Sequence, residues 1–138
     1  SCKTNVPGNV FAYILASHSP KLPVISFKVG TFYMPEKEHT TQIFDRMMDA
    51  IANNGCDAIY ALAGKDIINT SDLKVYFVGP TKIYGDNNAC SAVVKLEYKE
   101  TSILFTGDAE YSSERDMIAA GYDLSKVFFD LNRCLLLY

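Results

Sequence analysis

The sequence predicts an α/β fold, a mixed sheet with helices on one outer face. Three observations lead to this prediction: a helical stretch within residues 40–54, an alternating hairpin over 91–106, and the order strand, helix, strand, strand, hairpin, helix, strand. The chain has 138 residues, of which 49% are apolar and 21% are charged. That length and composition predict a single globular domain, 1–138, with a modest core.

In the first half, apolar runs of strand length occupy residues 10–16 and 24–29. A helix follows, with Thr40 or Thr41 as its N-cap and Gly55 just beyond its end. We expect this helix because its apolar side chains recur every three or four residues, at Ile43, Phe44, Met47, Met48 and Ile51. Residues 57–63 then predict a strand, and Gly64, Lys65 and Asp66 predict a turn.

The second half predicts a strand at 73–78, ended by Gly79 and Pro80, and then a loop through residues 84–88. Residues 91–98 and 101–106 predict a hairpin that turns at Lys99 and Glu100. Along its first strand, one face carries Val93, Lys95 and Glu97, and the other carries Val94, Leu96 and Tyr98. A short helix is expected from Ser112 or Ser113 to about Gly121, and residues 127–138 predict a strand plus a terminal segment.

Charge and hydropathy argue against two classes of function. The net charge of −3 provides no excess of basic side chains to hold a phosphate backbone by bulk electrostatics. The apolar runs are far shorter than the roughly 18–20 residues of a membrane span, so no span is predicted.

The cysteines are too far apart for a structural zinc site, because no two have the Cys-x-x-Cys spacing. Two interpretations stay open. Two disulfides would form only in an extracytoplasmic compartment, whereas free buried thiols fit any location. The residues concerned are Cys2, Cys56, Cys90 and Cys134.

Two segments at a fixed spacing carry a family resemblance. Residues 87–96 read NNACSAVVKL, and residues 101–110 read TSILFTGDAE. Together they resemble the metallo-β-lactamase-fold hydrolases of the competence protein ComEC type, a bacterial family, over about residues 24–124. The resemblance implies an αββα sandwich, of which this chain carries a partial version.

The resemblance also implies site residues. The family aspartate that bridges two metal ions, usually zinc, corresponds to Asp108, and the first family histidine corresponds to His18. Substrate-binding roles would fall on Asn87, Asn88 and Ser91. Without the resemblance, Asp108 is a loop aspartate that caps a helix, and the asparagines support the loop backbone.

The chain departs from the family where most metal ligands belong. The first metal motif would fall on residues 16–23, where only His18 fits, and the last on residues 127–134, which contain no histidine. The only other histidine, His39, matches no family ligand.

Two functions follow from this pattern. One is a metal-dependent hydrolase domain for phosphodiesters or related esters, inactive as this isolated chain. The other is a non-catalytic binding or assembly domain that keeps part of the fold. Because most of one sheet is missing, we expect a homodimer or other self-association. Nucleic acid is a partner by resemblance alone.

Overall fold

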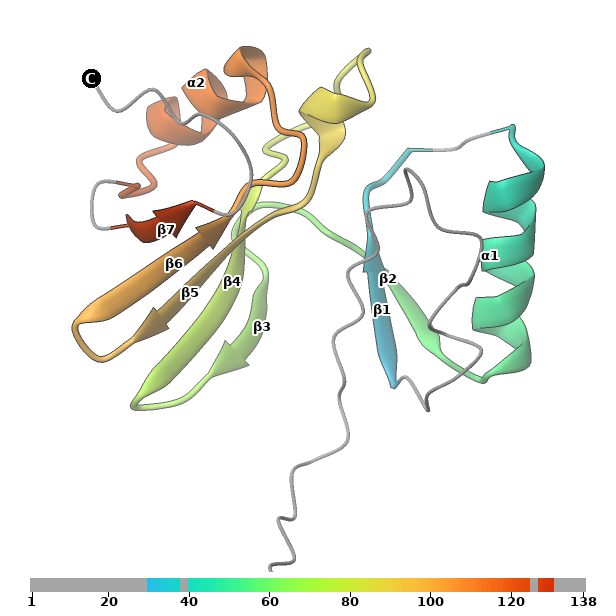
Figure 1. Ribbon diagram of the computed structural model, residues 1–138, viewed down its shortest axis with the longest axis horizontal. Helices are drawn as coiled ribbons and strands as arrows, with labels where there is room; N and C mark the ends of the chain where they lie inside the picture. Colours follow the sequence, from blue (N-terminus) through green and yellow to red (C-terminus); the bar gives the residue numbers. More distant parts are fainter. Residues whose placement is uncertain (1–29, 38–39, 125–126, 131–138) are drawn as a thin grey trace, which may run out of the picture. The chain divides into compact units, whose positions relative to one another are not determined.

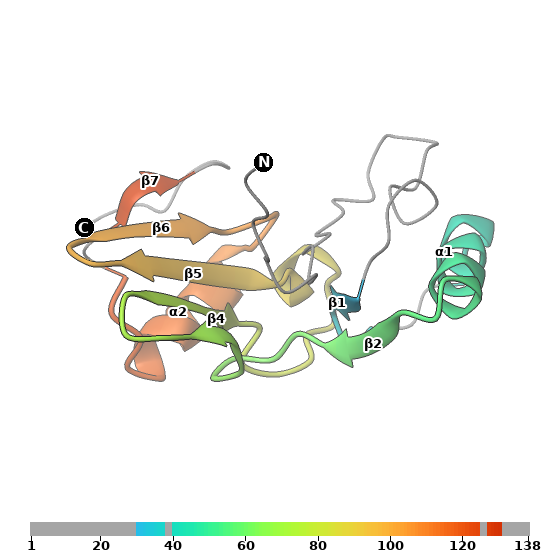
Figure 2. The same ribbon diagram turned by 90° about the horizontal axis from the view of Figure 1, so that it is seen from below.

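A computed structural model describes residues 30–37, 40–124 and 127–130, the last four by backbone alone. The strands expected at 10–16 and 24–29, together with His18 and His39, lie outside these residues. The chain forms two compact units, each seen from two directions in Figure 1 and Figure 2. The described part of the first comprises residues 30–34 and 40–60, and that of the second comprises 35–37, 61–124 and 127–130.

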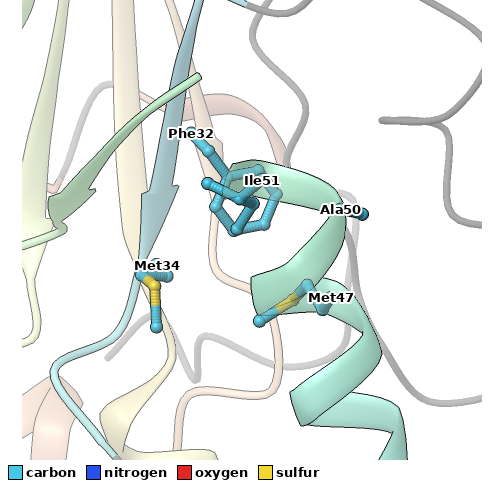
Figure 3. Packing of buried hydrophobic residues seen from close by; sticks show 5 residues of the cluster. All are labelled: Phe32, Met34, Met47, Ala50 and Ile51. Atoms are coloured by element: carbon cyan, nitrogen blue, oxygen red, sulfur yellow. The ribbon is translucent and has the colours of Figure 1, made fainter. Parts of the chain in front are cut away.

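The first unit is a strand–helix–strand motif. Strands β1 (Thr31–Met34) and β2 (Asp57–Tyr60) pair in parallel, and helix α1 (Gln42–Asn53) connects them. The unit buries its apolar side chains between helix and strands: in Figure 3 Phe32 lies against Ile51, and Met47 points from α1 toward β1. The whole buried cluster is Phe32, Met34, Met47, Ala50 and Ile51.

The predicted helix is confirmed, with both of its ends. The Thr41 hydroxyl accepts a hydrogen bond from the backbone N–H of Phe44 at 3.2 Å, which satisfies one of the donors left over in the first helical turn. Gly55 has φ +60°, the left-handed conformation that commonly follows a helix and that glycine adopts without steric cost.

The second unit contains a five-stranded sheet with the order β3-β4-β5-β6-β7. The first four strands run antiparallel to their neighbours, and β7 runs parallel to β6. A parallel neighbour needs a crossover, and helix α2 lies in it. The bounds are β3 Asp66–Asn69, β4 Leu73–Gly79, β5 Val93–Tyr98, β6 Thr101–Phe105, α2 Tyr111–Ala119 and β7 Val127–Asp130.

One face of this sheet packs against α2 (Figure 2). Met117 of α2 is fully buried there, and the close approach depends on Gly79, because a β-carbon at that position would lie 2.8 Å from the Met117 sulfur. Side chains from three strands, the helix and the segment after it make up this core: Val78, Val93, Leu104, Met117 and Leu124.

The opposite face of the same sheet is also apolar. Its cross-strand rows follow from the register: Phe77, Val94 and Phe105 form one, and Val75, Leu96 and Ile103 form the next. Phe77 is buried, whereas Phe105 is 37% exposed.

The α/β class is thus confirmed, and several boundaries differ from the prediction. Strands β1 and β3 were not expected, and Asp66, which was assigned to a turn, begins β3. Strand β2 ends at Tyr60 rather than at residue 63. Helix α2 begins at Tyr111 because Glu110 acts as its N-cap, where Ser113 Oγ accepts from the Glu110 N–H at 3.2 Å.

Candidate functional site

Asp108 lies directly after β6, as predicted. Thr106 at the strand end is buried, and Gly107 with φ +58° turns the chain. The turn is closed by the Ala109 N–H, which donates to the Thr106 carbonyl at 3.2 Å. This turn leaves Asp108 exposed to solvent at the carboxyl end of the strand. The local sequence therefore presents one carboxylate where β6 meets the connection to α2.

The loop that carries the asparagines is organised by Asp86. Its Oδ1 accepts from the backbone N–H groups of Asn88 at 2.7 Å and of Ala89 at 3.2 Å, at the start of a short 3₁₀ turn, η2 (Asn88–Cys90). Cys90 is buried and holds the same loop, because its sulfur accepts from the Tyr84 N–H at 3.2 Å. Cys90 and Cys56 are both free thiols.

The two sequence segments that carry the resemblance meet at this end of the sheet. The Asn88 side-chain amide donates to Glu110 Oε1 at 3.3 Å, which joins the loop before β5 to the start of α2. Of the other two predicted substrate residues, Ser91 is buried, and Asn87 is exposed. The hydrogen bond to Glu110 therefore holds Asn88 near the turn that carries Asp108. Ser91, in contrast, is buried.

A second contact holds this loop to the body of α2. The Tyr84 hydroxyl donates to Asp116 Oδ2 at 3.0 Å, and Lys82 forms an ion pair with the same carboxylate. Hydrogen bonds from Lys82 and Tyr84 lower the pKa of Asp116. Burial is the main cause that raises the pKa of Tyr84, so its hydroxyl stays protonated and acts as a donor. These contacts hold the loop against α2.

The described residues do not fit a two-metal centre. Within residues 30–37, 40–124 and 127–130, no group of three or more histidine, cysteine, aspartate or glutamate side chains is placed to hold a metal ion. A zinc ion requires about four ligands, and Asp108 provides a single carboxylate. His18, the other predicted ligand, lies outside the described residues.

Sequence reasoning missed a polar cluster on β5, the central strand of the sheet. Lys95 lies on the α2 side of β5 with only 4% of its side chain exposed. Its Nζ donates to the Asp123 carbonyl at 2.7 Å and pairs with Glu97 Oε1 at 2.9 Å. The signal was present in the alternation of the strand, which sets Lys95 on the same face as the buried Val93.

The charge of Lys95 is retained despite its burial. Burial alone would lower its pKa, but the hydrogen bond with Glu97 and the nearby Tyr76, Glu97 and Asp123 offset that effect, so the pKa lies above its ordinary value. Burial also raises the pKa of Tyr76. Both side chains are therefore protonated at neutral pH.

Lys95 and Glu97 also line an open pocket of about 360 Å³. Its walls consist of charged and hydroxyl side chains from the two hairpin turns, the strands between them and the segment after α2. Small-molecule sites are usually lined mainly by apolar side chains, so this pocket does not have the character of such a site. The remaining lining residues are Ser71, Asp72, Lys74, Lys99, Glu100, Thr101, Ser102 and Asp123.

Comparison with known proteins adds no family name. No family model, no curated protein and no solved structure matches the chain. Neither helix in the described part of the chain has the length and hydropathy needed to cross a membrane.

Proposed function

We propose that this chain is a domain of the metallo-β-lactamase-fold hydrolases of the ComEC type. In this proposal it derives from a zinc-dependent hydrolase of phosphodiesters or related esters. The observation that carries the proposal is the Asn88–Glu110 hydrogen bond of 3.3 Å. It joins one residue from each of the two sequence segments on which the resemblance rests, beside the turn that exposes Asp108.

The topology of the second unit supports the same proposal. Strand β6, with Ser102 and Leu104 buried, is followed by a glycine turn that carries Asp108, and the chain continues through α2 into a parallel β7. Carboxylates at strand ends suit metal binding, because a carboxylate has two oxygens and can bridge two cations. We include in this proposal that the fold is a partial αββα sandwich. The exposed position of Asp108 agrees with descent from a metal ligand.

As the isolated chain, the domain is proposed to be inactive. A lone carboxylate does not lower the pKa of a water molecule toward 7, which metal-assisted hydrolysis requires. The Tyr84–Asp116 and Lys95–Glu97 pairs are bound in contacts that support the fold.

The second candidate function is a non-catalytic domain for binding or assembly. One observation favours it: the sheet face opposite α2 is apolar across three strands, and Phe105 and Tyr98 on it are 37% and 49% exposed. Partly exposed apolar surface of this kind commonly marks contact with another protein.

Metal content and turnover of the purified chain test the first proposal. After dialysis against a weak chelator, we expect elemental analysis to find less than the two zinc ions of a complete site. Hydrolysis of a phosphodiester and of a β-lactam should stay at the rate without protein, both in the wild type and in Asp108→Asn. If two equivalents of zinc are retained, and turnover depends on Asp108, then the chain is an active enzyme and the inactive assignment is wrong.

A further inference from the structure

We propose that Asn54 is a site of spontaneous modification, at which the side-chain amide is converted to aspartate and isoaspartate. Asn54 is the only asparagine in the sequence that is followed by glycine. It caps the C-terminal end of α1, and its side chain is exposed. The proposal is independent of the proposed function, because it concerns the first unit alone.

The position of Gly55 is free of steric hindrance from side chains. Deamidation begins when the backbone nitrogen after an asparagine attacks its side-chain carbonyl carbon, and a side chain on the following residue hinders that approach. Gly55 has no side chain, and no heavy atom from elsewhere in the structure lies within 4 Å of the position that a β-carbon would take. Its φ of +60° lies in the open left-handed region, where glycine moves without steric cost.

The reaction balances with water as the only co-reactant. The Gly55 nitrogen forms a bond to Asn54 Cγ and gives up its proton, while the bond from Cγ to Nδ2 breaks and the amide nitrogen leaves as ammonia. The product is a five-membered imide. Water then opens the ring at one of its two carbonyl carbons. Cleavage of the bond between the Gly55 nitrogen and Cγ yields aspartate. Cleavage of its bond to the main-chain carbonyl carbon yields isoaspartate.

Two hydrogen bonds of the folded chain oppose this reaction. Asn54 Nδ2 donates to the Ala50 carbonyl at 2.8 Å, and the Gly55 N–H donates to the Ala52 carbonyl at 3.2 Å. Ring closure removes both donors. Unfolding releases both contacts, so the denatured chain should react faster than the native one.

The modification also replaces a hydrogen-bond donor at the helix end with a negatively charged acceptor. A carboxylate replaces the amide that donated to the Ala50 carbonyl, so two oxygens meet where a hydrogen bond was. The new negative charge lies at the C-terminal end of α1, where the helix dipole favours positive charge. The last turn of α1 supplies Ala50 and Ile51 to the core of the first unit. We therefore infer that the modified chain has a less stable first unit.

Peptide mapping by mass spectrometry tests the site. The intact chain is incubated in warm, neutral buffer, and the mass gained when an amide becomes an acid is measured at each asparagine. We expect conversion at Asn54 to exceed, several-fold, that at Asn53, Asn69, Asn87 and Asn88 in the same sample. Fragmentation that distinguishes isoaspartate should find both products. The gain should be faster in denaturant and absent at position 54 in Asn54→Gln, whose longer side chain closes a less favourable ring.

Two results would overturn the proposal. Conversion at Asn54 no faster than at the other asparagines would show that the position is not selective. A thermal unfolding midpoint of Asn54→Asp equal to that of the wild type would remove the inferred effect on the helix end, because this variant carries the product charge from the start.

Discussion

Lys95 shows how one charged residue is accommodated on a covered sheet face. It lines the pocket, and its ammonium group contacts the Asp123 carbonyl and Glu97. An ammonium group removed from water is tolerated when such contacts replace its hydration. Lys95 thereby joins the centre of the sheet to the segment that leads from α2 toward β7.

Replacement of Lys95 by methionine should destabilise the second unit. Methionine fills a similar volume, but the Asp123 carbonyl and Glu97 then lose their donor, at a cost of about 1–3 kcal/mol. Chemical denaturation of the wild type and Lys95→Met measures the difference in the free energy of unfolding. Lys65→Met is the matched control, because Lys65 is exposed in the same unit and does not line the pocket. Equal losses in both variants would contradict a special role for Lys95.

The same difference should decrease in alkaline solution. The pKa of Lys95 is raised in the folded chain above its ordinary value of 10.5. Its contribution is therefore fully present below the unfolded-state pKa and is lost as the pH rises through the folded-state pKa. The difference in the free energy of unfolding between wild type and Lys95→Met should be constant in neutral solution and should shrink in strong alkali.

At the scale of elements, the helix ends are set by single side chains. Thr41→Ala should lower the stability of the first unit by about 1 kcal/mol, because the Phe44 N–H loses its side-chain acceptor. Thermal unfolding followed by far-ultraviolet circular dichroism measures the change. Thr40→Ala is the control, since Thr40 is adjacent and exposed but is not the N-cap. A larger loss at Thr40 would show that the cap is assigned to the wrong residue.

Periodicity explains which elements the sequence predicted well. In helix α1 and in the hairpin of β5 and β6, the spacing of apolar residues repeats over enough positions to distinguish a helix from a strand. Strands β1 and β3 have four residues each, and Gly30 and Gly64 suggested turns there. Such short strands depend on their partners, which local sequence does not specify.

The candidate site was likewise predictable from the sequence only in part. The position of Asp108 followed from its own neighbours, a buried strand and a glycine turn. The contacts of Lys95 and of Tyr84 depend on Asp123 and Asp116, which lie 28 and 32 residues further along the chain. Only the folded sheet brings those groups together, so no local sequence pattern predicts these contacts.

For the whole molecule, the apolar sheet face opposite α2 leads us to predict self-association. Light scattering at high protein concentration should give a mass above the 15.3 kDa of one chain. Phe105→Ser should reduce that mass, because Phe105 lies on this face and is 37% exposed. Ile118→Ser on α2, where the side chain is 60% exposed, should not. A clean monomer in the wild type would contradict the prediction.

The order of strands in the second unit also implies an order of folding. Strands β3 to β6 are neighbours both in sequence and in the sheet, so their contacts close shorter loops than the pairing of β6 with β7 does. Strand β7 joins β6 only after α2 has crossed over, which requires a longer loop and a higher entropic cost. In pulse-labelled hydrogen exchange during refolding, we expect the amides of β4 and β5 to become protected before those of β7. Simultaneous protection would mean that the sheet forms as one cooperative unit, with α2 already docked.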